Sequence, residues 1–345
     1  MQRAPVSRDG EVLLLLCSFL GLPKGDQDGG PLTVQEWNGL AARIAQSPLE
    51  RPGALLGLDA ASLADALGVP PALGGRLHRL LARAGPLAIE LERLSSLGIW
   101  AVTRADEGYP DRLKEVLGPK APPCLFGAGD PELLARDAIA IVGSRDLDDE
   151  GREFAERVGR RCASAGLAVV SGGAKGTDRH GMTGALEAGG LAVGVLADSL
   201  ERSLASRDVR QWIVGEQLTL ITQFHPKAGF SVGNAMQRNK LIYGLARAAV
   251  VVASDLEKGG TWAGAVEDLQ AGWVPLYVRG GDAVPEGNRA LLKRGATQFP
   301  QDALDGDLRI LLEPPSDSTG SSPTSVQAAL FDLGATDTAH RPLSP

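Results

Sequence analysis

The sequence predicts an α/β protein with a doubly wound, mostly parallel sheet. Six apolar runs between residues 138 and 300 are separated by segments of helical composition: AIAIVGS, LAVVSGG, LAVGVLA, LTLITQF, AAVVVAS and VPLYVR. The runs are continuous in Val, Ala, Ile and Leu rather than alternating, which is typical of strands buried on both faces. Strands that alternate with helices form βαβ units and hence a parallel sheet.

A small helical domain is predicted before this sheet, in residues 1–97. Gly- and Pro-rich breaks separate periodic segments near 11–20, 33–46, 60–68 and 73–97. The region is rich in Leu and Ala, as small helical bundles are. We therefore expect four helical segments that pack together.

Two further regions flank the sheet. Residues 98–137 suggest a strand, a short helix and a second short strand that connect to the core of 138–300 and pack on it. Residues 301–345 are rich in Pro, Ser, Thr and Gly. Such a segment buries too little apolar surface to order itself, so we expect a disordered tail.

Composition limits the class of function. The net charge of −7 argues against a wholesale polyanion binder but leaves room for a local basic groove. The three cysteines lie far apart without CxxC spacing, which favours a reducing cytoplasm and predicts no metal site. The apolar run VLLLLCSFLGL is too short to span a bilayer, so we expect no membrane contact. No cofactor is predicted.

Small and basic residues follow four of the predicted strands. In a parallel sheet, ligands bind at the carboxyl ends of the strands, where glycines let the backbone approach and helix N-termini attract anions. We therefore predict a site for a phosphate-rich ligand. Its candidate residues are Gly143, Ser144, Arg145, Ser171, Gly172, Gly173, Lys175, Gly176, Asn234, Arg238, Asn239, Lys240, Lys258, Gly260 and Thr261.

Each candidate also has a purely structural interpretation. A Gly-rich turn after a strand is common in packing, and Arg238 and Lys240 could be ordinary solvated helix charges. The prediction depends on the coincidence of four loops rather than on any one residue.

Four segments together resemble the DNA-processing protein DprA (Smf) family: IAIVGSR, AGLAVVSGGAKGTDRHGMTGAL, QRNKLIYGLARAAVVVAS and KGGTWAGAVEDL. The resemblance covers residues 100–280. It implies a Rossmann-like fold, single-stranded DNA binding, a homodimer, interaction with the RecA recombinase and a role in processing incoming DNA. It also implies that the Gly-Ser-Arg turn, the second Gly-rich turn and the Arg-Asn segment form the DNA pocket.

The chain departs from the family pattern in the Arg-Asn segment, which often reads Phe-Pro-Arg-Arg-Asn-Arg and here reads AMQRNK. Lysine preserves a point charge but not a bidentate fork. Single-strand binding also uses aromatic rings for base stacking. Because the nearest candidates are only Phe224, Phe230 and Trp262, we expect phosphate contacts to dominate.

Two alternatives stay open. Nucleoside monophosphate phosphoribohydrolases of the same fold class carry Gly-Gly-x-Gly-Thr-x-x-Glu at the fourth loop, whereas this chain has Gly264 at the carboxylate position and Glu267 one helical turn later. A carboxylate displaced in this way loses most of its catalytic effect. We therefore expect no enzyme and no catalytic residues. A nucleotide-sensing module is the other alternative.

The tail contains one apolar island, SVQAALFDL at 325–333. Gln327, Leu330 and Phe331 match the Gln-x-x-Leu-Phe pattern with which bacterial replication and repair proteins dock to the sliding clamp. A chance match or a terminal packing helix would give the same letters.

Overall fold

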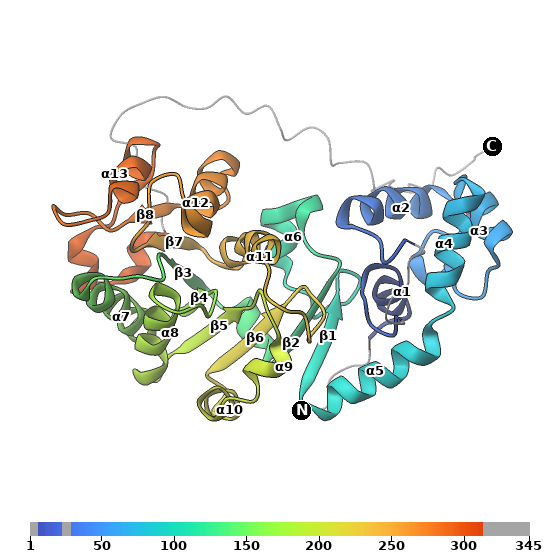
Figure 1. Ribbon diagram of the computed structural model, residues 1–345, viewed down its shortest axis with the longest axis horizontal. Coiled ribbons are helices and arrows are strands. Elements are labelled where there is room, and N and C mark those ends of the chain that lie inside the picture. The colour runs from blue at the N-terminus through green and yellow to red at the C-terminus, as the bar shows by residue number, and fades with distance from the viewer. Residues whose placement is uncertain (1–5, 23–28, 313–345) are drawn as a thin grey trace, which may run out of the picture. The chain divides into compact units, whose positions relative to one another are not determined.

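A nine-stranded sheet forms the centre of the computed structural model, which describes residues 6–22 and 29–312 (Figure 1). Its strand order is β1-β2-β6-β5-β4-β3-β7-β8-β9. Strands β3 to β9 run parallel, whereas β2 pairs antiparallel with both β1 and β6. The strands are β1 (Ile99–Thr103), β2 (Cys124–Ala128), β3 (Ala138–Val142), β4 (Ala168–Ser171), β5 (Leu191–Val195), β6 (Leu218–Thr222), β7 (Ala248–Val251), β8 (Leu276–Val278) and β9 (Thr297–Gln298).

The six predicted strands are confirmed as β3 to β8. Strand β9 was not predicted, because its two residues are both exposed and carry no apolar run. The segment 98–137 contains the predicted strand, helix and strand. Its two strands extend the sheet by antiparallel pairing, so this segment is part of the sheet as well as packed on it.

Helices cover both faces of the parallel strands. Ile139 and Ile141 of β3 pack in one buried cluster with Phe154, while Ala140 and Val142 pack in another with Ile242. This division confirms the doubly wound architecture. The helices of this region are α6 (Asp111–Leu117), α7 (Asp149–Ser164), α8 (Thr177–Glu187), α9 (Leu200–Ser203), α10 (Arg207–Val214), α11 (Val232–Leu245), α12 (Gly259–Ala271) and α13 (Glu286–Lys293).

The strand order reverses at β3. From β3 the chain adds β4, β5 and β6 on one side, and α11 then carries it back across the sheet to β7, on the other side of β3 (Figure 1). Loops that follow β3 and β7 therefore diverge at their carboxyl ends. In open α/β sheets a ligand crevice forms at this kind of switch point.

The N-terminal helices are α1 (Arg8–Cys17), α2 (Val34–Gln46), α3 (Ala60–Leu67), α4 (Pro71–Leu81) and α5 (Ala84–Ser96). The prediction of a single helical segment at 73–97 is therefore wrong, because α4 ends at Leu81 and a second helix, α5, begins at Ala84. Arg83 lies at the break and is buried, and its guanidinium donates to the carbonyl oxygens of Leu80, Leu20 and Leu15. Leu15 and Leu80 lie in the last turns of α1 and α4, so two of these bonds satisfy carbonyls that helix ends leave free.

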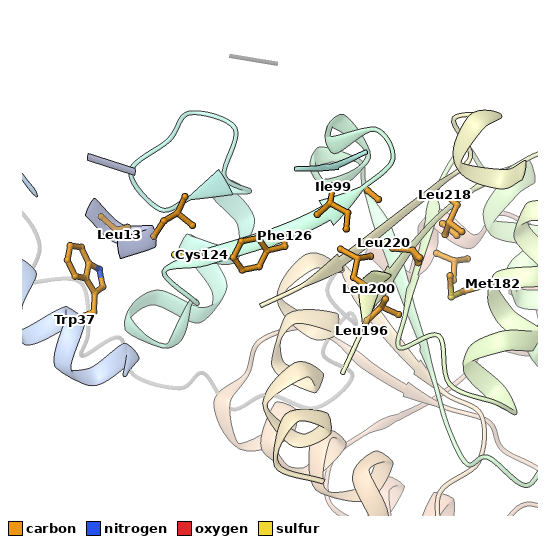
Figure 2. Packing of buried hydrophobic residues seen from close by; sticks show 14 of the residues in the cluster. Leu13, Trp37, Ile99, Cys124, Phe126, Met182, Leu196, Leu200, Leu218 and Leu220 are labelled. Carbon is orange, nitrogen blue, oxygen red and sulfur yellow. The ribbon is translucent and has the colours of Figure 1, made fainter. Parts of the chain in front are cut away.

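The N-terminal helices and the sheet share one hydrophobic cluster. Figure 2 shows it running from Leu13 and Trp37 through Phe126 of β2 to Leu220 of β6 and Met182 of α8. The described residues up to 312 belong to one compact unit. The boundary at residue 97 thus marks a change of architecture without a separate core, and as a domain boundary it stays a prediction.

The first twelve residues of the expected disordered tail, 301–312, are ordered. Residues 301–312 form two 3₁₀ turns, Gln301–Leu304 and Leu308–Leu312, instead of belonging to a disordered segment from 301 onward. The reason is burial, since Leu304, Leu308 and Leu311 all join the core. In the part of the chain that the structure describes, no helix has the length and apolar character needed to cross a membrane.

Candidate nucleic-acid interface

A cavity of about 480 Å³ lies at the switch point of the sheet. We call it the switch-point cavity. It is lined by the loops after β3 and β7, by α11, by Ala174 of the β4–α8 loop and by Asp178 of α8. The lining residues are Val142, Gly143, Ser144, Arg145, Asp146, Ala174, Asp178, Phe230, Val232, Ala235, Met236, Arg238, Asn239, Ile242, Tyr243, Asp255, Lys258, Gly259, Gly260 and Thr261.

Arg238 is the buried cation of this cavity. It is only 7% exposed, yet its Nε and Nη1 find no hydrogen-bond partner within the described residues. Its ion-pair partner is Asp178, whose Oδ2 lies 3.8 Å from Nη1. Buried guanidinium donors are costly to leave unbonded, and such exceptions require an explanation. A ligand anion in the cavity would supply one.

Gly172 provides the space in which Arg238 lies. A Cβ added at residue 172 would overlap the Arg238 guanidinium, and it would also approach Asp178 Oδ2 to 2.5 Å. The sequence predicted that this glycine would let the backbone approach a ligand. Instead Gly172 is buried, and its missing side chain admits an arginine that faces the ligand space.

Asp178 is the second residue of α8 and is buried with Arg238. Burial raises the pKa of the Asp178 carboxyl, whereas the Arg238 guanidinium opposes this rise. Burial likewise lowers the pKa of Arg238. The amide of Ala174 donates weakly to Asp178 Oδ2, at 3.4 Å. The two side chains thus form a buried ion pair that lacks a full set of hydrogen bonds.

The N-terminus of α12 forms another wall. Lys258 occupies the N-cap position, and no side chain among the described residues caps the helix. Its first residues, Gly259, Gly260 and Thr261, line the cavity. Asn239 of α11 donates to the carbonyl oxygen of Gly260 at 3.0 Å and holds this turn in place. Uncapped helix N-termini favour anions through their free N–H groups and the helix dipole.

Arg145 and Phe230 lie at the mouth of the cavity. The guanidinium carbon of Arg145 lies 5.5 Å from the Phe230 ring centroid, in a cation–π arrangement, and the ring is 53% exposed. Trp262 is only 8% exposed and packs beneath Arg294, so it offers no stacking surface. Phe230 is therefore the candidate stacker that the structure places at the site.

The structure brings together most of the predicted residues, but not all of them. Ser171 is fully buried in β4, and its hydroxyl donates to the carbonyl oxygen of Ile141. Lys240 points to Glu267 of α12, with Nζ and Oε1 3.1 Å apart. Five other predicted residues do not line the cavity: Gly172, Gly173, Lys175, Gly176 and Asn234.

Some lining residues were not predicted. Asp178 and Tyr243 lie within the segments SGGAKGTDRHG and NKLIYGLA, yet a lone acidic residue in a first helical turn usually stabilises the helix, and a lone tyrosine usually packs. Only the contact with Arg238 distinguishes Asp178. Within residues 6–22 and 29–312, no three His, Cys, Asp or Glu side chains come close enough to hold a metal ion. Gln327, Leu330 and Phe331 lie outside the described residues.

The model of the family "DNA recombination-mediator protein A" matches residues 100–305. This match covers more than half of the chain. The chain belongs to that family. The family assignment agrees with the resemblance to DprA (Smf) proteins.

Individual relatives match more modestly. DNA processing protein DprA from Streptococcus pneumoniae is 29% identical over 174 residues, which is 50% of this chain and 59% of that protein. A putative DprA from Mycobacterium tuberculosis is 30% identical over 225 residues, which is 61% of this chain and 57% of that protein. The matches thus span somewhat more than half the length of these relatives.

The fold also matches a solved structure. The X-ray structure of DprA from Streptococcus pneumoniae superimposes with a TM-score of 0.64 and 22% identity, over 88% of this chain and 99% of that one. This likeness shows a shared fold, including the region before the parallel strands.

Proposed function

We propose that the protein binds single-stranded DNA along the carboxyl edge of the parallel strands, with one nucleotide in the switch-point cavity. The observation that carries this proposal is Arg238, a buried cation whose Nε and Nη1 lack partners within the described chain and which lines the cavity. A backbone phosphate beside Arg238 would provide the missing acceptor.

The surroundings of Arg238 support an extended polyanion. Arg145 and Lys258 are exposed at the mouth of the cavity, and Lys175 is exposed on the same edge of the sheet. Cations spaced along a groove bind successive phosphates, and the affinity then falls as the salt concentration rises. The exposed Phe230 ring favours single over double strands, because only unpaired bases can stack on it.

Binding of a labelled oligo(dT) and of a duplex of equal length, measured by fluorescence anisotropy at two salt concentrations, tests this function. We expect tighter binding of the single strand and a negative log–log salt slope. Equal affinity for both DNAs, or no binding at low salt, would remove the proposal.

Within this function we propose the role of a recombination mediator. Family membership supports a protein that brings RecA onto single strands, and the homodimer implied by the resemblance would present two cavities. We also propose that the protein acts in the cytoplasm, because its three cysteines are unpaired. The test is RecA ATPase activity on DNA coated with single-strand binding protein, which the chain should increase. Sedimentation tests the dimer.

The phosphoribohydrolase alternative has less support. Glu267, the displaced candidate carboxylate, is paired with Lys240 and does not line the cavity. The described lining residues include Asp178, but this carboxylate is engaged with Arg238. Release of ribose 5-phosphate from a nucleoside monophosphate by the purified protein would support the phosphoribohydrolase function instead.

A further inference from the structure

The switch-point cavity is balanced in charge rather than strongly positive. Its lining contains three cations, Arg145, Arg238 and Lys258, and three carboxylates, Asp146, Asp178 and Asp255. Of the carboxylates, Asp146 and Asp255 are exposed to solvent, which screens them. Asp178 is buried, so its charge acts at close range on whatever enters the cavity.

Asp178 is ionised because Arg238 is. Arginine keeps its charge in proteins, and a buried cation without a counterion is strongly destabilising. Among the described residues, Asp178 is the carboxylate in ion-pair contact with Arg238, at 3.8 Å. With this loose geometry, Nε and Nη1 of Arg238 have no hydrogen-bond partner among the described residues. An entering anion therefore meets a cation that is already neutralised by a carboxylate.

We propose that this cavity selects the singly charged phosphodiester of an internal nucleotide over the doubly charged phosphate of a free nucleotide or strand end, and that Asp178 sets the selection. This inference rests on the proposed binding of single-stranded DNA. Asp178 is a positioning and specificity residue: it orients Arg238, and its charge repels a second negative charge on the ligand.

The size of the effect follows from the charges. The second pKa of a terminal phosphate is about 6, so at higher pH a terminal phosphate carries one more negative charge than a phosphodiester. The extra charge would lie several ångströms from the Asp178 carboxylate, in a medium of intermediate dielectric constant. Repulsion at that distance corresponds to a difference of about tenfold in affinity. The protein would thus recognise the interior of a strand without preferring its ends.

Two ligands that differ in one methyl group test the selection. Thymidine 5′-monophosphate is a dianion at pH 8, whereas thymidine 5′-methylphosphate is a monoanion with the same base and sugar. Each is used to displace labelled oligo(dT) from the full-length protein. We expect the methyl ester to compete about tenfold better. Equal competition, or better competition by the monophosphate, would overturn the proposal.

Two variants assign the selection to its residue. In Asp178→Asn we expect the difference between the two ligands to fall to about twofold or less, whereas Asp255→Asn, which removes an exposed carboxylate of the same cavity, should keep it near tenfold. A structural defect alone would weaken both ligands without changing their ratio. A ratio that stays at tenfold in Asp178→Asn would rule out Asp178.

Two further outcomes distinguish a failure of this inference from a failure of the proposed DNA binding. Suppose that oligo(dT) binds but that neither nucleotide competes at concentrations up to about 10 mM, which corresponds to a very weak affinity. The cavity is then not a phosphate subsite, and the inference fails while the proposed function stands. If oligo(dT) itself does not bind, the proposed function fails with it.

Discussion

Two cavities of similar size lie at opposite edges of the parallel strands, and they differ in how their arginines are satisfied. The one at the amino edge, of about 450 Å³, is lined by Arg112, Arg247 and several carboxylates. There Arg112 Nε donates to the carbonyl oxygen of Ala246 at 2.8 Å, and Arg247 Nε donates to Asp137 at 2.7 Å. In the switch-point cavity, Arg238 has two nitrogens without partners in the described chain.

The difference shows that volume alone does not identify a binding site. At the amino edge, the backbone bonds to Arg112 and a carboxylate bonds to Arg247, and five acidic side chains line the space against three basic ones. An anion gains little there. At the carboxyl edge, Arg238 keeps two buried donors without a partner in the described chain, and leaving such donors unbonded costs free energy that a new acceptor would recover.

Removing Arg238 should have the largest effect on binding. Arg238→Ala deletes a charge-assisted contact of about 1.5–3 kcal/mol, so we expect single-stranded DNA affinity to fall roughly 10- to 100-fold in an anisotropy titration. It also leaves Asp178 buried without its cation, which lowers the melting temperature. The double variant Arg238→Met with Asp178→Asn should recover stability but not binding.

The amino-edge cavity provides the control. Arg247→Ala removes an exposed ion pair with Asp137, with side chains 51% and 53% accessible. Such pairs contribute only about 0–1 kcal/mol to stability. DNA affinity should stay unchanged. A loss of binding comparable to that of Arg238→Ala would mean that the two edges do not differ as the contacts indicate.

Gly172→Ala should nearly match the loss caused by Arg238→Ala while keeping every charge. The new Cβ would occupy the space of the Arg238 guanidinium, which must move. We expect about tenfold weaker DNA binding and a loss of stability of about 1–3 kcal/mol, as overpacking typically causes. Gly233→Ala is the matched control in α11, because the nearest atom to its added Cβ is 3.9 Å away. Unchanged affinity in Gly172→Ala would show that Arg238 need not lie where the structure places it.

The role of Gly172 shows where sequence reasoning succeeds and where it ends. Continuous apolar runs predicted β3 to β8 because a strand buried on both faces needs apolar residues on both. Glycines and cations after those strands predicted a site at the carboxyl edge, where the structure has a cavity that Arg145 and Arg238 line. The pairing of Arg238 with Gly172 and Asp178 joins residues about 60 positions apart, and no local pattern encodes it.

Other differences have the same origin. Ser171 and Lys240 fitted the pattern of small and basic residues, yet one bonds to the carbonyl oxygen of Ile141 and the other to Glu267. Both partners come from neighbouring elements that only the fold brings close. The ordered turns after residue 300 were missed because polar composition concealed three leucines that the core buries.

Asp268 sharpens the comparison, because it has an unpartnered buried atom outside both cavities. It is fully buried, Oδ1 accepts from the Val274 amide at 3.2 Å, and Oδ2 has no partner in the described chain. Burial raises the pKa of the Asp268 carboxyl to about 7. The folded state then binds a proton more tightly than the unfolded state, so stability falls as pH rises from about 4 to about 7.

Asp268→Asn should therefore affect stability and not binding. We expect the stability gained by the variant over the natural chain to be larger at pH 8 than at pH 5 by about 2–3 kcal/mol, measured by urea unfolding. Asp65→Asn, which makes the same substitution at an exposed position of α3, is the control and should change stability by less than about 0.5 kcal/mol. If Asp268→Asn bound DNA more weakly, a buried polar atom without a partner would matter for binding even where its residue does not line a cavity, contrary to the comparison with Arg238.

Arg145→Ala and Lys175→Ala should have smaller effects, because both side chains are exposed. Each removes at most one phosphate contact, so the log–log salt slope of single-strand binding should shrink by about 0.7 per variant. Arg145→Ala should lose more affinity, since it also leaves Phe230 without its cation–π partner. Unchanged slopes in both variants would confine binding to the buried cation and remove the exposed groove from the proposal.

Glu267→Gln should have the smallest effect. The carboxylate holds Lys240 at 3.1 Å, with both side chains about one-third exposed, and neither residue lines the switch-point cavity. Partly exposed ion pairs contribute little, so stability should change by less than about 1 kcal/mol. The freed lysine could at most add one distant cation to the groove, and we expect DNA affinity to rise by less than about twofold. Lys240→Gln, which breaks the same pair from the other side, should leave affinity equally unchanged. A several-fold gain in Glu267→Gln that Lys240→Gln does not share would show that Lys240 can reach the DNA, and the AMQRNK segment would then supply a second phosphate contact beside Arg238.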